Sequence, residues 1–286
     1  MSSDYCIMIN GLPGKMASLI CNAVFERQME SSGQIELVYE ALTGPDMGTT
    51  FDCDSKPIWL RAPEKHASCL KEVKAEHPNL IAIDFVKGKG QGDKNAQMYF
   101  ENRIPFIMGS TGIEDYNVLD LAAKHTNTPC VAFPNMDKRI VIWMEMFKYA
   151  AENFSGSFAD MSELSLLESH QAAKEDTSGT MKQMIGHLSA LTGKKLTIDD
   201  ITKIRDKKAQ RKLLEVPEKW LGQHAYHFFA FNDPYGQDSE RLEFRRHGGK
   251  TYVEGTMTAL DFLIDVIENK KEARRYEMID VLRKSA

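Results

Sequence analysis

Short apolar runs alternate with segments of helical periodicity along the first half of the chain. Apolar runs predict strands at residues 5–10, 35–40, 80–85, 105–108 and 129–133, with a small β element at 51–61. Between them, apolar residues recur every three to four positions and predict helices after residue 14 and at 64–76, 95–102 and 113–124. Apolar strands that alternate with helices predict an α/β fold with a doubly wound parallel sheet.

The second half has a different pattern, with fewer strand–helix–strand units. It begins with a predicted helix at 140–154, where we expect Trp143, Met146, Phe147 and Ala150 in the core. We then expect a strand at 162–167, a helix at 181–191, a helix start or partner contact at 197–204 and a solvated charged face at 205–211. Alternation at 224–231 and 241–246 predicts antiparallel strands, followed by a strand at 250–254, a helix at 259–267 and a short element at 276–282. This order predicts an α+β domain.

Composition narrows the class of protein. The 286 residues fit one large domain or two smaller ones, and the net charge of −5 gives no general case for nucleic acid or an anionic membrane. No apolar run approaches the roughly 20 residues of a membrane helix. The five cysteines lack CxxC spacing, and apolar residues begin directly after Met1–Asp4. We therefore expect reduced thiols, no signal or transit peptide, and a cytoplasmic location.

A glycine-containing turn joins the first strand to the first helix. Gly11 permits a tight turn, and Gly14 lets a phosphate approach backbone N–H groups at a helix start. The pattern Gly-x-x-Gly-x-x-Ala, ending at Ala17, differs from the usual Gly-x-Gly-x-x-Gly, and Ile9 stands at the first glycine position. The turn therefore indicates a dinucleotide site, with a plain β–α turn as the alternative.

The following strands bear on which nucleotide binds. Glu40 falls inside the predicted second strand, which extends towards Thr43, so it is more often a strand residue than a ribose ligand. The predicted second strand has no acid at its end that would repel a 2′-phosphate, and Lys15 would lie near the phosphates of the dinucleotide. These two features favour NADPH over NADH. The basic, glycine-rich loop at 87–92 follows the predicted strand at 80–85. It would contact either the cofactor or only solvent.

Residues 168–180 gather the polar chemistry of the second half. His170 can exchange a proton near neutral pH, and Lys174 adds a full positive charge. Ser178 or Thr180 can cap the next helix, whose N-terminal N–H groups attract a carboxylate. The segment predicts an anion site, although His170 could simply bond a backbone carbonyl and Ser178 could simply cap a helix.

At these residues the chain resembles the 4-hydroxy-tetrahydrodipicolinate reductase (dihydrodipicolinate reductase) family of lysine biosynthesis, over nearly its whole length. The signature is Glu168-Ser169-His170-Gln171-x-x-Lys174-x-Asp176-Thr177-Ser178-Gly179-Thr180. Similar family motifs are found at 11–16, 84–85, 105–112, 134–136, 252–256 and 276–282. His-Gln, in place of the His-His of most bacterial members, is similar to the plant-like branch.

The resemblance implies a fold and a reaction. A Rossmann-like dinucleotide-binding domain would comprise 1–134 and 255–286, and a mixed-sheet substrate-binding and oligomerisation domain 135–254. NAD(P)H would reduce a cyclic imine dicarboxylate, with His170 as proton donor and Lys174 holding the substrate. Substrate binding is expected at Gln171, Ser178, Gly179 and Thr180. Cofactor binding is expected at Gly11, Gly14, Lys15, Met16, Thr43, Phe85, Gly109, Thr111, Pro134, Asn135 and Met136. No metal is expected, and the family pairs subunits, which implies a homo-oligomer (dimer or tetramer).

Several positions depart from the family pattern. Val86 stands where the family has Thr, Gly88 lies near its usual Pro, and the Lys174–Ser178 spacing is one residue shorter than in most bacterial members. These differences leave two alternatives open. One is a related NAD(P)-dependent dehydrogenase with another amino-acid or imine substrate, and the other is a non-catalytic NAD(P)H sensor, against which the retained His170 and Lys174 argue.

Overall fold

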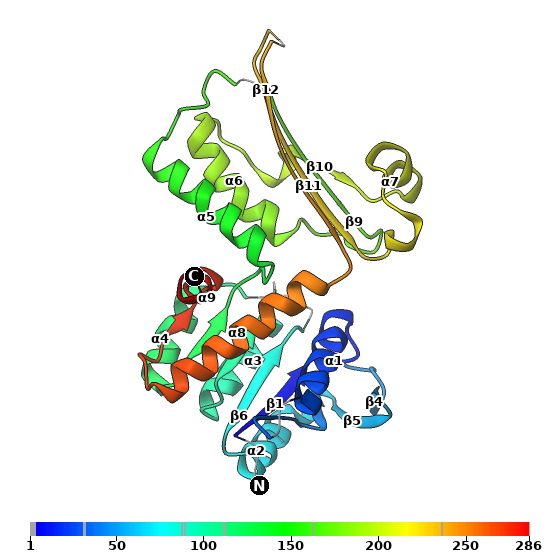
Figure 1. Cartoon of the computed structure of the whole chain (residues 1–286), viewed down its shortest axis with the longest axis vertical. Helices are drawn as coiled ribbons and strands as arrows, with labels where there is room; N and C mark the ends of the chain where they lie inside the picture. The colour runs from blue at the N-terminus through cyan, green and yellow to red at the C-terminus, as the bar shows by residue number, and fades with distance from the viewer. Residues whose placement is uncertain are drawn as a thin grey trace. The chain divides into compact units, whose positions relative to one another are not determined.

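The chain folds into two compact units in the computed structural model. The structure describes residues 4–30, 33–86, 88, 90–110, 113–161, 163–235 and 237–285. Unit 1 comprises residues 1–138 and 251–286, and unit 2 comprises residues 139–250 (Figure 1). None of the described helices combines the length and apolar character that crossing a bilayer requires. All five cysteines are buried and unbridged.

Unit 1 is built on a six-stranded parallel sheet with the strand order β13-β8-β7-β6-β1-β2. Its strands are β1 (Tyr5–Asn10), β2 (Ile35–Leu37), β6 (Leu80–Asp84), β7 (Phe106–Met108), β8 (Cys130–Ala132) and β13 (Arg275–Tyr276). Apolar residues on both faces of the four central strands β1, β6, β7 and β8 are buried, as in sheets covered by helices on two sides. The predicted parallel α/β sheet is confirmed.

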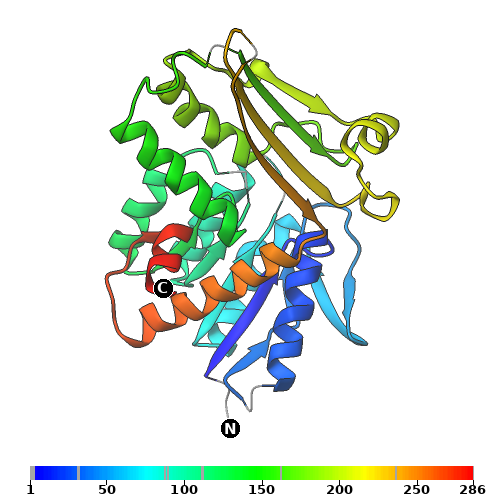
Figure 2. The ribbon, with the colours of Figure 1, turned by 45° about the horizontal axis from the view of Figure 1, so that its top comes forward.

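Helices cover both faces of this sheet (Figure 1 and Figure 2). One face packs in a continuous core against α2 (His66–Glu76), α3 (Gln91–Glu101) and α4 (Tyr116–Thr126). The other face carries α1 (Lys15–Glu30) and α8 (Lys250–Glu268), which an Arg27–Asp261 ion pair of 2.5 Å connects. The chain ends in α9 (Met278–Ser285).

A second, three-stranded sheet in unit 1 has the order β3-β5-β4. It consists of β3 (Glu40–Leu42), β4 (Thr50–Cys53) and β5 (Lys56–Arg61). The prediction of one strand over 35–40 is therefore wrong, because the chain leaves the large sheet after Leu37 and Glu40 opens a strand of another sheet. Glu40 accepts two hydrogen bonds from Arg61, at 2.5 and 2.7 Å, so its carboxylate is already bound within the protein.

Unit 2 contains a four-stranded mixed sheet with the order β10-β9-β11-β12. Its strands are β9 (Glu163–His170), β10 (Ile201–Ile204), β11 (His224–Asn232) and β12 (Ser239–His247). Strand β10 is parallel to β9, whereas β11 is antiparallel to both β9 and β12. Helices α5 (Lys138–Asn153) and α6 (Gly179–Thr192) lie on one side of this sheet, and α7 (Lys207–Leu214) lies on the other (Figure 1). The predicted antiparallel strands and mixed sheet are confirmed.

Two predictions for the second half are wrong. Residues 250–254 form the start of α8 rather than a strand. At residues 197–204 the predicted helix start is present, because Thr197 caps a short 3-10 helix, and the strand β10 follows it. On α5, Trp143 and Met146 are 38% and 52% exposed, because Ile140, Val141 and Met144 face the interior instead.

Helix α8 approaches the backbone of the segment after β8 at Gly255. A Cβ atom on Gly255 would lie 1.7 Å from the carbonyl oxygen of Met136, and backbone cannot move aside as a flexible side chain can. We therefore expect Gly255→Ala to lower the free energy of unfolding by about 3 kcal/mol.

Urea unfolding followed by circular dichroism measures the effect. Gly186→Ala is the matched control, because Gly186 is also helical and a Cβ there has no neighbour within 4 Å in the described part of the chain. The control should gain up to about 1 kcal/mol. Equal unfolding midpoints for Gly255→Ala and wild type would contradict the close packing at Gly255.

Candidate functional site

The turn after β1 has the strand–turn–helix geometry that the sequence predicts. Gly11 has a φ of 98°, and α1 begins at Lys15 directly after Gly14. A Cβ on Gly11 would lie 2.9 Å from the backbone carbon and oxygen of Phe85, so both the conformation and the space require glycine. Gly14 and Lys15 are exposed at the start of α1, where the positive end of the helix dipole lies.

Other residues expected at the cofactor lie at the ends of neighbouring strands. The backbone N–H of Gly11 donates to Leu42 at 2.8 Å, and the hydroxyl of Thr43 donates to the carbonyl of Leu12 at 2.5 Å. The ring of Phe85 covers Gly109, where a Cβ would lie 2.4 Å from the ring. The structure thus brings Gly11, Thr43, Phe85 and Gly109 together at the carboxyl edge of the parallel sheet, which is where ligands bind in such sheets.

A buried polar network, which the sequence reasoning missed, supports this edge. The carboxylate of Asp84 accepts hydrogen bonds from Tyr99 at 2.6 Å, from Asn95 at 2.8 Å and from the backbone N–H of Val86 at 2.9 Å. Asn10 connects the network to β1 through a 2.8 Å bond to the Tyr99 hydroxyl. Burial raises the pKa of Asp84, although these hydrogen bonds oppose the shift. The network fixes the backbone on which Gly11 and Phe85 sit.

The remaining residues expected at the cofactor differ in how far they are exposed. Pro134 is partly exposed, whereas Asn135 and Met136 are buried. The Asn135 side chain accepts a hydrogen bond from the backbone N–H of Asp137 at 2.8 Å, which shapes the turn after β8. Thr111 lies outside the described residues.

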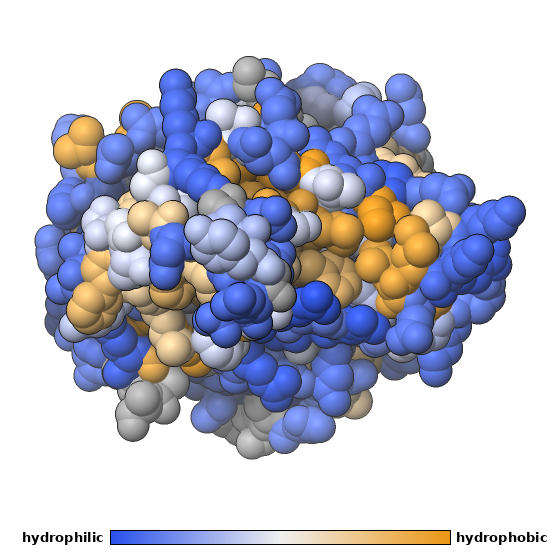
Figure 3. Space-filling view, turned by 90° about the horizontal axis from the view of Figure 1, so that it is seen from above, coloured by the Kyte–Doolittle hydropathy of each residue, from blue (hydrophilic) through white to orange (hydrophobic). Residues whose placement is uncertain are grey.

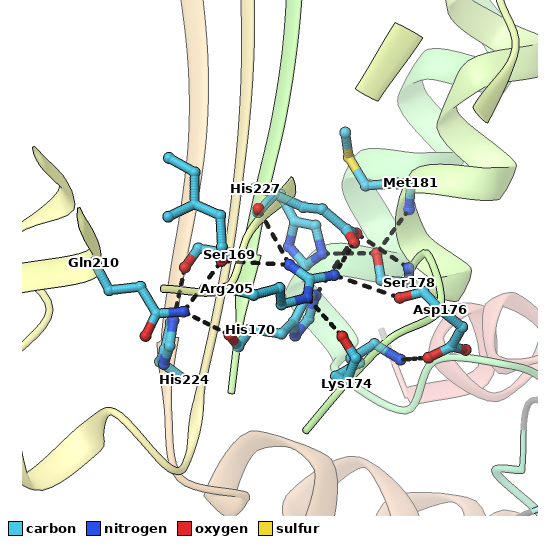
Figure 4. A network of polar contacts seen from close by, with 12 residues as sticks. Ser169, His170, Lys174, Asp176, Ser178, Met181, Arg205, Gln210, His224 and His227 are labelled. Carbon is cyan, nitrogen blue, oxygen red and sulfur yellow. Dashed lines mark hydrogen bonds and ion pairs between the residues drawn. The ribbon is translucent and has the colours of Figure 1, made fainter. Parts of the chain in front are cut away.

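In unit 2, the end of β9 and the start of α6 form a polar centre (Figure 4). Ser178 is the N-cap of α6, and its hydroxyl accepts from the backbone N–H of Met181 at 3.2 Å. The backbone N–H of Ser178 donates to the Glu168 carboxylate at 3.0 Å. The predicted cap is confirmed, and Gly179 and Thr180 form the first turn of the helix, whose N–H groups and dipole favour an anion.

Two histidine rings meet at this centre. His170 is the last residue of β9, which extends three residues beyond the predicted strand, and its ring lies edge-on to His227 of β11 with 5.2 Å between centroids. His227 lies within 3.0 Å of the Ser178 hydroxyl. Within the described part of the chain, Nε2 of His170 has no hydrogen-bond partner and lies 3.8 Å from the Glu168 carboxylate. Nε2 of His170 therefore does not bond a backbone carbonyl of the described residues, which was the alternative to a catalytic role.

Burial keeps both rings neutral. It lowers the pKa of His170 to about 2, with further contributions from His227, Lys174 and Arg205, and lowers the pKa of His227 to about 4. The Lys174 ammonium forms a 2.8 Å ion pair with Asp176, and its side chain is 21% exposed. Burial would raise the pKa of Asp176, but the hydrogen bond from Lys174 and the charges of Lys174 and Lys182 outweigh it and hold this pKa low. Gln171 is partly exposed beside His170.

Arg205 and Gln210 also belong to this centre, and both were missed by the sequence reasoning. The prediction that 205–211 is a solvated face is wrong at these two positions. The Arg205 guanidinium forms a short ion pair with the fully buried Glu168, and the buried Gln210 amide donates to the His170 carbonyl at 2.7 Å. Their partners lie more than thirty residues away in the chain, so local charge spacing held no signal of them.

The cluster of Glu168, His170 and His227 also resembles a metal-ligand set. One ligand atom from each residue lies within 4.8 Å of the others. However, one Glu168 oxygen accepts from Arg205 and the other from the Ser178 N–H. With both oxygens bound and the charges of Arg205 and Lys174 nearby, a cation is electrostatically disfavoured.

The depressed histidine pKa values predict a pH dependence of stability. The unfolded chain protonates His227 near its ordinary value of 6.5, whereas the folded chain protonates it only near 4. As pH falls from 7 to 5 the unfolded state binds more protons, so stability falls, by about 2 kcal/mol for this one ring. Hence His227→Asn should lose about 2 kcal/mol less than wild type over the same range.

Urea unfolding at both pH values measures this difference. His125→Asn is the control, because His125 is exposed on α4, and its loss should equal that of wild type. Identical losses for all three proteins would show that His227 titrates normally in the folded state.

Comparisons with known proteins agree with the fold and the motifs. Residues 5–136 match the family described as "Dihydrodipicolinate reductase, N-terminus", and residues 139–282 match "Dihydrodipicolinate reductase, C-terminus". The chain is 35% identical over 280 residues to 4-hydroxy-tetrahydrodipicolinate reductase 1, chloroplastic, of Arabidopsis thaliana, covering 97% of this chain and 77% of the relative. It is 24% identical to the 4-hydroxy-tetrahydrodipicolinate reductase of Syntrophus aciditrophicus, covering 96% of this chain and 97% of the relative.

A solved structure shares the fold. The dipicolinate-bound dihydrodipicolinate reductase of Paenisporosarcina sp. TG-14 has a TM-score of 0.60 to this chain at 16% identity, covering 97% of this chain and 98% of that one. At this identity the likeness concerns the fold alone. The two matched regions together span nearly all of the sequence, and the chain therefore belongs to the dihydrodipicolinate reductase family.

Proposed function

We propose that this protein catalyses the NAD(P)H-dependent reduction of 4-hydroxy-tetrahydrodipicolinate to tetrahydrodipicolinate in lysine (diaminopimelate) biosynthesis. One observation carries the proposal: in a chain of this family, the Lys174 ammonium, a neutral buried His170 and the capped N-terminus of α6 are gathered at one centre. In this proposal unit 1 binds the nicotinamide cofactor and unit 2 binds the substrate.

The chemistry of unit 2 suits a dicarboxylate. Ser178, Gly179 and Thr180 would receive one carboxylate at the N-terminus of α6, where backbone N–H groups and the helix dipole favour negative charge. The Lys174 ammonium would leave Asp176 and bind a substrate carboxylate, because a carboxylate close to the start of α6 interacts with both the ammonium and the helix dipole. Gln171 would contribute a neutral hydrogen-bonding amide beside them.

His170 would act as the proton donor. Its pKa of about 2 makes it neutral before substrate arrives, so it would gain its proton only in the complex. A substrate with two negative charges close to the ring favours the imidazolium and raises that pKa. Loss of the 4-hydroxyl group as water would give the unsaturated ring that is reduced, and the cofactor would supply the hydride. The proton on Nε2, a ring atom with no hydrogen-bond partner among the described residues, would go to the substrate.

The cofactor site of unit 1 fits a dinucleotide. Glycine is required at Gly11, and the start of α1 at Gly14, Lys15 and Met16 would receive phosphate oxygens. We propose NADPH as the preferred cofactor, with NADH as the second choice. Glu40 is the acid that the sequence offers as a possible ribose ligand. Its carboxylate is bound by Arg61 and so would not bind a 2′-hydroxyl.

A coupled assay with a dihydrodipicolinate synthase tests the proposal. We expect oxidation of NADPH that requires both the synthase product and this protein, and slower oxidation of NADH. Oxidation of an amino acid with NADP⁺, without any activity on the synthase product, would instead support the related dehydrogenase. If NADPH left the melting temperature of the protein unchanged, the enzyme hypotheses and the sensor hypothesis would both fail, because each requires that the cofactor binds.

We also propose a homo-oligomer, either a dimer or a tetramer, assembled through the sheet of unit 2. Leu167 and Phe228 are paired on the sheet face that α7 covers in part, and both remain partly exposed. Figure 3 shows apolar surface, in orange, between hydrophilic side chains on the face that it draws. Light scattering would measure the mass. A cytoplasmic location remains a prediction, since the Arabidopsis relative is named chloroplastic.

A further inference from the structure

Arg205 follows β10 directly and reaches three parts of the polar centre (Figure 4). Its Nε donates to the backbone carbonyl of Lys174 at 2.6 Å, and its Nη2 reaches the carbonyl of Asp176 at 3.4 Å. Nη2 also forms the short ion pair with Glu168, and Nη1 lies 3.4 Å from the Glu168 carbonyl. One guanidinium thus ties the backbone of the loop 171–177 to β9 and β10.

Glu168 extends this connection to the other end of the loop. Its side chain is fully buried, and its second oxygen accepts the Ser178 N–H at 3.0 Å, one residue before α6 begins. The loop is therefore held at Lys174 and Asp176 by Arg205 and at Ser178 by Glu168. The hydrogen bond from the Lys174 N–H to the Gln171 carbonyl, at 2.9 Å, is local and does not tie the loop to the sheet.

We propose that Glu168 and Arg205 are positioning residues, which hold the Lys174 ammonium at a fixed place relative to the N-terminus of α6. This inference rests on the proposed function, because it takes Lys174 and the helix start as the groups that bind the two ends of one dicarboxylate. A planar guanidinium donates in several fixed directions, which a lysine ammonium at the same position cannot reproduce. Arg205 therefore serves by its shape as well as its charge.

Charge balance gives the pair a second role. Without Arg205, the buried carboxylate of Glu168 would lie 3.8 Å from Nε2 of His170 without its counter-ion. It would then attract the Lys174 ammonium and raise the pKa of His170, which would place a proton on the ring before substrate arrives. By neutralising Glu168, Arg205 keeps His170 neutral and leaves Lys174 paired with the more exposed Asp176.

Arg205→Lys tests whether the planar shape of the guanidinium is needed, because lysine keeps the positive charge. We expect Arg205→Lys to lower kcat/KM by about 100-fold, since misplacing a binding group by about 1 Å has that effect. Amide hydrogen exchange at residues 171–177 should speed up while exchange in β11 stays unchanged. Arg211→Ala is the matched control, because Arg211 lies on α7, close to Arg205 in sequence, and forms an exposed ion pair with Glu218. This variant should retain wild-type kinetics and exchange.

A double-mutant comparison separates positioning from general damage. If Arg205 acts through Lys174, then Arg205→Lys introduced into Lys174→Ala should reduce the remaining activity less than about 3-fold. Two results would overturn the proposal: wild-type kinetics and loop exchange in Arg205→Lys, or a full additional 100-fold loss in the Lys174→Ala background.

Failure of the proposed function is distinguishable from failure of this inference. The affinity for pyridine-2,6-dicarboxylate, measured by calorimetry, probes the same groups without turnover. If wild type binds this dicarboxylate but does not reduce the synthase product, the assigned reaction fails. In that case a tenfold or greater loss of dicarboxylate affinity in Arg205→Lys, together with faster loop exchange, still supports the positioning role, and unchanged affinity and exchange reject it.

Discussion

Lys174→Ala is expected to lower kcat/KM by about 10³-fold, because the variant loses a charged group that would bind the substrate and stabilise charge as it develops. The Lys174 ammonium is partly exposed and is held by Asp176 and, through its backbone carbonyl, by Arg205. Such a group can exchange a protein carboxylate for a substrate carboxylate without leaving an unpaired charge in the interior. Steady-state kinetics in the coupled assay measures the loss.

The matched control for this prediction is Lys208→Ala. Lys208 is an exposed lysine of α7 and should retain wild-type kinetics. NADPH affinity should stay unchanged in both variants, because the proposed cofactor residues belong to unit 1. Wild-type turnover in Lys174→Ala would remove Lys174 from the mechanism and leave the N-terminus of α6 as the candidate anion site.

Gly11→Ala is expected to weaken NADPH binding by about 100-fold, equivalent to nearly 3 kcal/mol. The added methyl group would lie 2.9 Å from the Phe85 backbone, and the φ of 98° is itself unfavourable for alanine. Relief of this contact must move either the turn or the strand end that bears Phe85, and both are expected to contact the cofactor. Fluorescence titration with NADPH measures the affinity.

Gly33→Ala separates crowding from backbone strain. Gly33 also has a positive φ, of 93°, but a Cβ there meets no atom of the described residues within 4 Å. This control should lose stability and retain its NADPH affinity. Wild-type affinity in Gly11→Ala would show that the turn after β1 is not where the dinucleotide binds.

Features encoded by neighbouring residues could be predicted from the sequence. The turn at Gly11 and the cap at Ser178 each follow from a few adjacent positions, and the structure has both. The apolar residues of β9 predicted a strand only as far as Leu167, and β9 extends three residues further to His170. The alternation of apolar strands with helices was enough to predict the parallel sheet of unit 1.

Features that depend on strand register or distant contacts could not be predicted. His227 reaches the site because β11 pairs with β9 so that His227 lies opposite Glu168, and no local pattern specifies that register. Arg205 lies in a run of charges that is typical of a solvated surface, and its partner is 37 residues away. Residues 250–254 include Thr251 and Val253, which favour strands, yet the packing of α8 on the sheet determines their conformation.

Transfer of deuterium from labelled NADPH tests the central claim most directly. The coupled reaction would be run with NADPH that carries deuterium at the transferable C4 position of the nicotinamide, and the product would be analysed by mass spectrometry. The proposed reaction predicts one deuterium in each tetrahydrodipicolinate formed, and almost none formed by Lys174→Ala in the same time. Oxidation of the cofactor without deuterium in the product, or no oxidation in the presence of the synthase product, would contradict the assignment of this chain as the reductase.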